Sequence, residues 1–298
     1  MKKTIGFIGL GVMGAGMARN VAEAGFDLVV TTRSPDKADI FRKIGACVAE
    51  NPAELAARCD VIVTCVPDAS ALRALVEGES GLAAGRWDNG LLIDCSTIAP
   101  FETTEIARAL AKAGASVIDA PVSGGAKGAD SGTLTIMCGG AGKDFERARD
   151  VLQAMGKNIH HVGPLGAGQA VKACNQLMVS INMMGVFEAI GLARAAGVDP
   201  KVMREVLSTG AARSGVLEAH ALRYLDDSLQ PGFRAELMRK DLGIANAVGS
   251  HFNITQPATN LAHQMLIATC NNGHAGLDSA AMGLLYETLN GLSEGEGR

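Results

Sequence analysis

The chain lacks any long run of basic residues. Lys and Arg number 27 against 31 Asp and Glu, which gives a formal net charge of −4, and the basic residues are scattered along the sequence. A surface that follows a nucleic-acid backbone needs clustered positive charge. The sequence therefore predicts no nucleic-acid partner, and any anionic ligand should be small and locally bound.

An uninterrupted apolar run of the roughly 18 to 20 residues that a membrane span requires is also missing. The apolar start at residues 1–14 is short, interrupted by glycine and continuous with a helical pattern, unlike a secretory signal. Residues 292–298 are polar and glycine-rich, which predicts a tail without secondary structure. We therefore expect a cytoplasmic protein without a membrane partner.

Neither cysteine nor histidine is arranged like a metal site. The six histidines show no ligand spacing, and the adjacent His160 and His161 cannot share one face of a strand. The cysteines lack CxxC spacing and lie mostly in apolar runs, so buried thiols in a reducing compartment are expected. They are Cys47, Cys59, Cys65, Cys95, Cys138, Cys174 and Cys270. The sequence predicts no metal site.

Short β-rich runs alternate with helical stretches through the first half of the chain. Runs such as VIVTCV and GLLIDC are apolar without alternation, as expected for parallel strands covered on both faces. From about Ala167 to Ala196 the pattern becomes one long helix, and little strand signal follows it. The predicted fold is α/β: a Rossmann doubly wound parallel sheet over residues 1–164, then an all-α domain over residues 165–298, joined by the long helix.

Small residues and methionines occur all around the long helix. They predict that it is buried on most sides, partly by another subunit, and hence that the protein is a homo-oligomer such as a dimer or tetramer.

A G-x-G-x-x-G motif directly follows the apolar run TIGFI and precedes a helical pattern. In this context it predicts a dinucleotide-binding turn, in which backbone N–H groups and the helix N-terminus face a diphosphate. A glycine-rich turn without a ligand is the alternative. The predicted cofactor contacts here are Gly9, Leu10, Gly11, Val12, Met13 and Gly14.

The end of the second predicted strand bears on the choice of cofactor. Thr32 stands where an Asp or Glu would accept a hydrogen bond from a free ribose 2′-hydroxyl. Arg33 and Ser34 follow at once and suit a 2′-phosphate, although a solvated loop arginine is the alternative. NADP is therefore the predicted cofactor, with NAD as the alternative.

Two further strand ends carry candidate cofactor residues. Val66 and Pro67 end one apolar run, and Thr97 follows another, at the edge of an open α/β sheet where ligands lie. Pro67 would form a wall of the site and Thr97 would bind the nicotinamide ribose. Ordinary turn chemistry explains these residues equally well.

Two more segments suggest substrate chemistry. Ser123, Gly124 and Gly125 form a loop whose N–H groups suit a carboxylate, with a connecting turn as the alternative. Lys172 and Asn175 share one face of the long helix, with Gln176 beside them. Reduction of a carbonyl by hydride leaves an alkoxide that an ammonium stabilises and protonates, so Lys172 is the predicted catalytic acid and Asn175 its partner. A solvated helix face is the alternative.

The motifs GLGVMG, DAPVSGGAKGADSGTL, GAGQAVKACNQ and GFRAELMRKDL, in this order, resemble the β-hydroxyacid dehydrogenase family. The resemblance covers nearly the whole chain. It implies an NAD(P)-dependent dehydrogenase or reductase with a Rossmann domain and an all-helical domain. It also implies that Lys172 is catalytic, that Ser123, Gly124, Gly125 and Asn175 bind substrate, and that Thr97 and Lys240 contact the nicotinamide.

The last of these motifs adds three residues. Lys240 would reach the cofactor, Asp241 would support the cleft between the two domains, and Phe233 would close over the substrate. A surface charge pair and a core aromatic are the alternatives.

Within the family, residues 210–242 and 276–291 are most similar to the tartronate semialdehyde reductases. That similarity implies reversible reduction of a small carboxylate semialdehyde by NADPH. Dehydrogenases of the 3-hydroxyisobutyrate, succinic semialdehyde or glyoxylate type are the alternatives, followed by a noncatalytic NADP-binding module. Many relatives have an acidic residue where Thr32 stands, so their preference for NAD does not transfer to this chain.

Overall fold

The computed structural model describes residues 3–85, 87 and 89–292. By its internal contacts the chain divides into two compact units, Met1–Lys172 and Ala173–Arg298. The division falls inside the helix α8 (Ala167–Ala195), whereas the sequence prediction started the second domain at residue 165. The first two residues of the apolar start and residues 293–298 of the predicted tail lie outside the described residues.

One sheet forms the centre of the first unit. Its strand order is β3-β2-β1-β4-β5-β6-β8-β7, with β9 paired to β8. Strands β1 to β6 pair in parallel in the Rossmann order, which confirms the predicted doubly wound sheet. The strands are β1 Thr4–Ile8, β2 Asp27–Thr31, β3 Cys47–Val48, β4 Val61–Thr64, β5 Leu91–Asp94, β6 Ser116–Asp119, β7 Val122–Ser123, β8 Leu134–Gly139 and β9 Gly156–Gly163.

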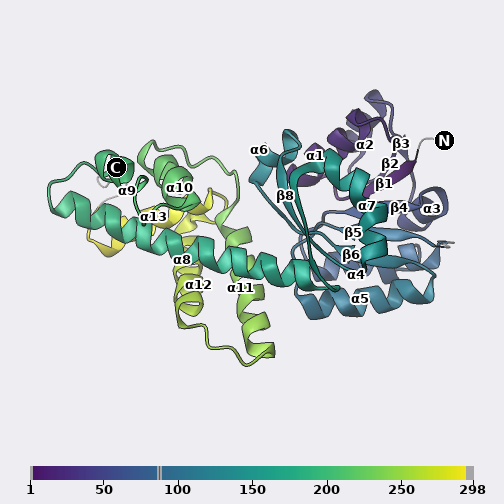
Figure 1. Ribbon diagram of the computed structural model, residues 1–298. Coiled ribbons are helices and arrows are strands. Elements are labelled where there is room, and N and C mark those ends of the chain that lie inside the picture. The colour runs from purple at the N-terminus through teal and green to yellow at the C-terminus, as the bar shows by residue number, and fades with distance from the viewer. Residues whose placement is uncertain (1–2, 86, 88, 293–298) are drawn as a thin grey trace. The chain divides into compact units, whose positions relative to one another are not determined.

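Helices cover both faces of this sheet (Figure 1). In β1, the side chains of Ile5 and Phe7 enter the core that α1 and α7 cover, whereas Ile8 enters the core beneath α3, α4 and α5. Both faces are therefore apolar, which explains why the strand sequences do not alternate. The helices are α1 Val12–Glu23, α2 Pro35–Lys43, α3 Pro52–Arg58, α4 Ala69–Glu77, η1 Leu82–Ala84, α5 Pro100–Lys112, α6 Gly125–Asp130 and α7 Gly142–Met155.

The far end of the sheet differs from the sequence prediction, which assigned no element between Ser123 and Gly163. The structure places α6, β8, α7 and β9 there. Strand β8 also runs antiparallel to β6 and β7, so the sheet is not parallel throughout. The βαβ rhythm predicts only parallel neighbours, and the antiparallel pairing depends on contacts that no local pattern reveals.

The described part of the second unit is helical apart from an isolated bridge between Arg234 and Asp278, which confirms the all-α prediction. By length and composition alone, α8 could cross a membrane, but it is a core helix of this unit: Met183, Phe187 and Ile190 are buried. The helices after α8 are α9 Pro200–Leu207, α10 Gly215–Leu225, α11 Ala235–His251, α12 Pro257–Thr269, η2 Cys270–His274, η3 Ser279–Ala281 and α13 Met282–Leu289.

All seven cysteines are described and are free thiols. The expectation that they are buried is wrong for Cys47 and Cys174, which are exposed. Cys47 begins the two-residue strand β3 at the end of the sheet, and Cys174 lies on an exposed face of α8.

Candidate active site

The residues predicted to bind cofactor in the first unit gather at one edge of the sheet. Gly9 follows β1, Thr32 follows β2, Val66 follows β4 and Thr97 follows β5. Because these strands are parallel, their carboxyl ends lie at the same edge. Ser123, on β7, follows the carboxyl end of β6. Four loops and one short strand from distant parts of the sequence thus meet at this edge.

The glycine-rich turn is shaped by close backbone approaches. Gly9 has φ +100°, and a Cβ there would collide with the carbonyl of Cys65 in the loop after β4. A Cβ on Gly14 would collide with the carbonyl of Gly9. Glycine at both positions therefore lets α1 start tightly against β1 and the neighbouring loop.

The N-terminus of α1 fits a diphosphate. Its N-cap, Gly11, is exposed, a Cβ added there would meet nothing within 4 Å, and no side chain caps the helix. The first turn carries no acidic residue. The side chains of Leu10 and Met13 pack in or against the core and that of Val12 is 72% exposed, so the turn would bind phosphate mainly through its backbone.

The loop after β2 suits a second anion. Strand β2 ends at Thr31, and the Thr32 hydroxyl accepts a hydrogen bond from the Ser34 N–H at 3.2 Å. Arg33 is exposed and therefore accessible to a ligand. No acidic residue occurs between 31 and 34, so nothing within this loop repels a phosphate.

The loop that carries Thr97 is fixed from two sides. The Ser96 hydroxyl accepts a hydrogen bond from the Val66 N–H at 3.0 Å, which joins the loops after β4 and β5. The side chain of Gln169, in the first turn of α8, donates to the Ser96 carbonyl at 2.8 Å and accepts from the Ile98 N–H at 3.2 Å. Thr97 thus lies between two backbone groups that Gln169 binds.

The same first turn of α8 is anchored to the sheet by a buried carboxylate. Asp119, at the end of β6, accepts hydrogen bonds from the N–H groups of Gly166 at 2.7 Å and Gln169 at 2.8 Å. A Cβ on Gly168 would lie 2.7 Å from the Asp119 carboxylate, so glycine permits this approach. Lys172 follows on the same helix and is only 6% exposed, which is contrary to the solvated-face alternative.

In the loop predicted to hold a carboxylate, Ser123 pairs with Thr135 of β8. Gly124 and Gly125 both have positive φ, at +136° and +62°. This backbone form favours glycine and also occurs in connecting turns, so it fits both alternatives. The carboxylate-binding role of the loop stays a prediction.

In the second unit, hydrogen bonds and an ion pair link three of the predicted residues with Gln176. Asn175 donates to the Gln176 side chain at 2.8 Å, and Gln176 donates to Asp241 at 2.6 Å. The Lys240 ammonium lies 3.1 Å from the other Asp241 oxygen, and Asp241 is buried. The structure therefore joins Asn175 to Lys240, which the sequence assigned to separate motifs.

Phe233 lies where the core alternative placed it. Its ring packs against the apolar core of the second unit, and its N–H donates to Asp278 at 3.1 Å. A role in closing over a substrate stays a prediction.

Comparison with known proteins identifies the family. Residues 4–163 match the NAD-binding domain of 6-phosphogluconate dehydrogenase, and residues 166–286 match the NAD-binding domain of NADP-dependent 3-hydroxyisobutyrate dehydrogenase. The chain is 38% identical to the 2-hydroxy-3-oxopropionate reductase of Escherichia coli over 93% of this chain and 95% of that one. The chain belongs to the β-hydroxyacid dehydrogenase family.

Further relatives support this assignment. The human mitochondrial 3-hydroxyisobutyrate dehydrogenase is 35% identical over 94% of this chain and 86% of its own length. The structure of a Mycobacterium tuberculosis 3-hydroxyisobutyrate dehydrogenase with L-serine superposes with a TM-score of 0.88 at 32% identity, covering 97% of this chain and 99% of that one. The predicted class, an NAD(P)-dependent oxidoreductase, is confirmed, and the noncatalytic alternative loses its support.

Two buried carboxylates of this β-hydroxyacid dehydrogenase had no role in the sequence prediction. Asp94, at the end of β5, accepts from the Thr64 hydroxyl at 2.8 Å and the Ser96 N–H at 3.1 Å, and burial raises its pKa to about 6. Burial also raises the pKa of Asp119, although hydrogen bonds from the N–H groups of Gly166 and Gln169 oppose the shift. The available signal was a single Asp at the end of each apolar run, LLID and SVID.

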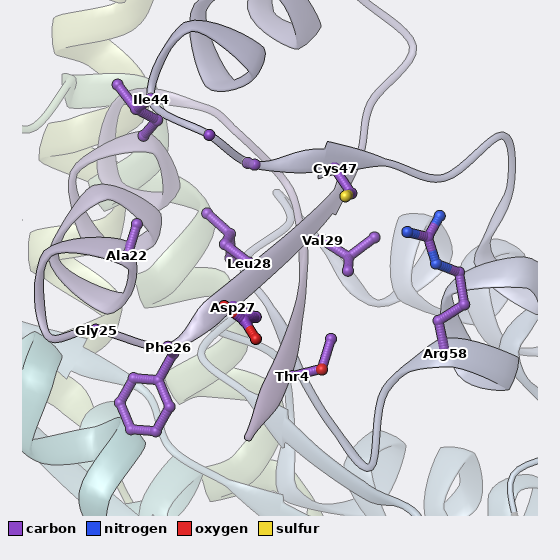
Figure 2. Close-up of a pocket in the computed structure, with 12 residues that line it drawn as sticks. Thr4, Ala22, Gly25, Phe26, Asp27, Leu28, Val29, Ile44, Cys47 and Arg58 are labelled. Atoms are coloured by element: carbon purple, nitrogen blue, oxygen red, sulfur yellow. The ribbon is translucent and has the colours of Figure 1, made fainter. Parts of the chain in front are cut away.

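A cavity of about 610 Å³ lies at the opposite edge of the sheet and is separate from the predicted site. Figure 2 shows Thr4, Asp27 and Cys47 lining it, at the amino ends of β1, β2 and β3. Arg58 also lines this cavity, and its guanidinium pairs with Glu54 at 3.0 Å. Ligands of open α/β sheets bind at the carboxyl ends of the strands, so this cavity is not the cofactor site.

Proposed function

We propose that this family member reversibly reduces a small carboxylate semialdehyde of the tartronate semialdehyde type to a hydroxy acid, with NADPH. One observation carries the proposal: Lys172 is buried on α8. In the first turn of the same helix, Gln169 forms hydrogen bonds with the backbone on both sides of Thr97. The identity with the E. coli 2-hydroxy-3-oxopropionate reductase supports the choice of substrate.

In this proposal each group of residues has one task. The reduced nicotinamide supplies the hydride. Lys172 donates a hydrogen bond to the carbonyl oxygen and then its proton, because charge develops on that oxygen during reduction. Asn175 orients the substrate hydroxyl, and the loop from Ser123 to Gly125 holds the carboxylate.

NADPH is favoured over NADH by the loop after β2. Arg33 is exposed, and residues 31–34 lack the carboxylate that a free 2′-hydroxyl would require. A guanidinium and a hydroxyl in sequence suit a phosphate dianion. We also propose a cytoplasmic location and a homo-oligomeric state for the protein.

A 3-hydroxyisobutyrate dehydrogenase activity is the second candidate, because the human relative of that name is 35% identical over most of its length. The deciding experiment measures oxidation of NADPH and NADH with tartronate, methylmalonate and succinic semialdehydes and with glyoxylate. Turnover that is fastest with tartronate semialdehyde and NADPH would support the proposal. Faster turnover of methylmalonate semialdehyde would replace it with the second candidate, and no turnover of any aldehyde would reject both.

A further inference from the structure

Gln169 makes an unusual pair of contacts for a helix residue. It is 1% exposed, and its amide binds the backbone on both sides of Thr97: its Nε2 donates to Ser96 O and its Oε1 accepts from Ile98 N. The residues it joins lie 73 and 71 positions away in the sequence. A buried amide that satisfies one donor and one acceptor of the same loop fixes that loop in one position.

The backbone of Gln169 is fixed as firmly as its side chain. Its N–H donates to the buried Asp119 carboxylate at 2.8 Å, as does the N–H of Gly166 at 2.7 Å. Lys172 is three positions after Gln169 and is therefore a neighbour on the next turn of α8. The position of Lys172 along the sheet edge is thus set by the same residue that holds the Thr97 loop.

The network extends one loop further. Ser96, whose carbonyl binds Gln169, accepts from the Val66 N–H through its hydroxyl and donates its own N–H to Asp94. Asp94 in turn accepts from Thr64 at the end of β4. Continuous hydrogen bonds therefore run from the loop after β4, through the loop after β5, to the first turn of α8.

We propose that Gln169 is a positioning residue that sets the separation between the cofactor loop at Thr97 and the Lys172 ammonium. The proposal rests on the proposed function for the roles of those two residues. Hydride and proton must reach opposite ends of one carbonyl bond, so a displacement of about 1 Å between their donors costs on the order of a hundredfold in rate. In this proposal Gln169 acts only through the Thr97 loop and the first turn of α8.

The test compares Gln169→Met with the wild type. Methionine has a similar length and fills the space but removes both loop hydrogen bonds. We expect kcat for the best aldehyde to fall by about tenfold to a hundredfold. The NADPH dissociation constant, from fluorescence titration, should change less than about threefold, because the glycine-rich turn and Arg33 are untouched. An unchanged kcat, or a loss confined to NADPH affinity, would overturn the proposal.

Val151→Ala is the matched control for stability. Val151, on α7, is fully buried in the core of the same unit, and it is not one of the residues proposed to bind cofactor or substrate. A variant with a similar loss of thermal stability but normal kcat would show that the effect of Gln169→Met is not a general loss of folding. Equal losses of kcat in both variants would count against a positioning role.

Hydrogen exchange followed by mass spectrometry gives a readout that does not depend on turnover. In the wild type, NADPH should slow exchange in residues 96–99 and also in residues 166–172. In Gln169→Met, protection of residues 166–172 should be lost while residues 9–14 stay protected. If the wild type lacks any turnover but shows this coupling, the proposed function fails and the positioning role stands. If residues 166–172 are protected equally in both proteins, or in neither, the positioning role fails.

Discussion

Burial of the ionised Asp94 carboxylate costs free energy in the folded protein. It is 1% exposed, and its hydrogen bonds from Thr64 and Ser96 only partly offset burial, so its pKa rises to about 6 from a usual value of 3.8. The folded state therefore binds the Asp94 proton more tightly than the unfolded chain does. Protonation of this group stabilises the fold, the reverse of the usual behaviour of a carboxylate.

This shift predicts a pH-dependent difference between the wild type and Asp94→Asn. The variant keeps an oxygen acceptor for Thr64 and Ser96 but has no charge to bury. Relative to it, the wild type should lose about 3 kcal/mol of unfolding free energy as pH rises from about 4 to about 6, and no more above that. Denaturant unfolding of both proteins across this range measures the difference. A difference that does not change with pH would contradict the account.

Arg33 offers a second prediction at the scale of one residue. Arg33→Asp replaces the cation that we propose binds the 2′-phosphate with a carboxylate that suits a ribose 2′-hydroxyl. The ratio of kcat/KM with NADPH to that with NADH should fall at least tenfold, since a hydrogen bond to a charged group contributes about 1.5–3 kcal/mol. Arg108→Asp, the same change at an exposed position of α5, is the control and should leave the ratio unaltered. A preserved ratio in Arg33→Asp would place the 2′-phosphate elsewhere.

Among the helices, strands and turns, the sequence predicted those whose form depends on residues close together in the chain. The long helix was predicted at 167–196 and spans Ala167–Ala195, and the glycine-rich turn lies between β1 and α1 as expected. The antiparallel pairing of β8 with β6 and β7 was not predicted because it depends on nonlocal contacts. For the same reason the contacts of Asp119 and Gln169, which span 47 to 73 residues, could not be read from any motif.

The start of α8 supplies a prediction at this scale. A Cβ on Gly168 would collide with the Met137 carbonyl and crowd Asp119, whereas one on Gly185 of the same helix would meet nothing within 4 Å. Gly185→Ala should therefore stabilise the protein by up to about 1 kcal/mol through helix propensity. Gly168→Ala should lower the thermal midpoint despite the same propensity gain. Equal effects of the two substitutions would show that α8 does not pack on β6 and β8 as described.

At the scale of the whole molecule, the helical unit presents apolar side chains that the described chain leaves uncovered. No residue of α9 is buried, and Val202 and Val206 are 51% and 62% exposed. The composition of α8 predicts that a second copy of the chain covers these side chains. We therefore predict that the helical unit of this oxidoreductase associates with that of a second copy.

Substitution of these valines tests the prediction of a homo-oligomer. Wild-type protein should have a molar mass of at least two chains by light scattering, and Val202→Asp combined with Val206→Asp should shift it toward one chain. Ile40→Asp, also at a 51% exposed position but on α2 of the first unit, should leave the mass unchanged. A wild-type mass of one chain, or a double variant of unchanged mass, would contradict the prediction.

We propose that Lys172 supplies the proton in an NADPH-dependent reduction, and the Lys172→Ala variant measures that contribution. With the best aldehyde of the panel, kcat should fall by about 10² to 10⁴-fold, while the NADPH dissociation constant stays within about threefold of the wild type. Lys112→Ala, at an exposed position of α5, is the control and should have normal kcat. Turnover by Lys172→Ala at the wild-type rate would contradict the account.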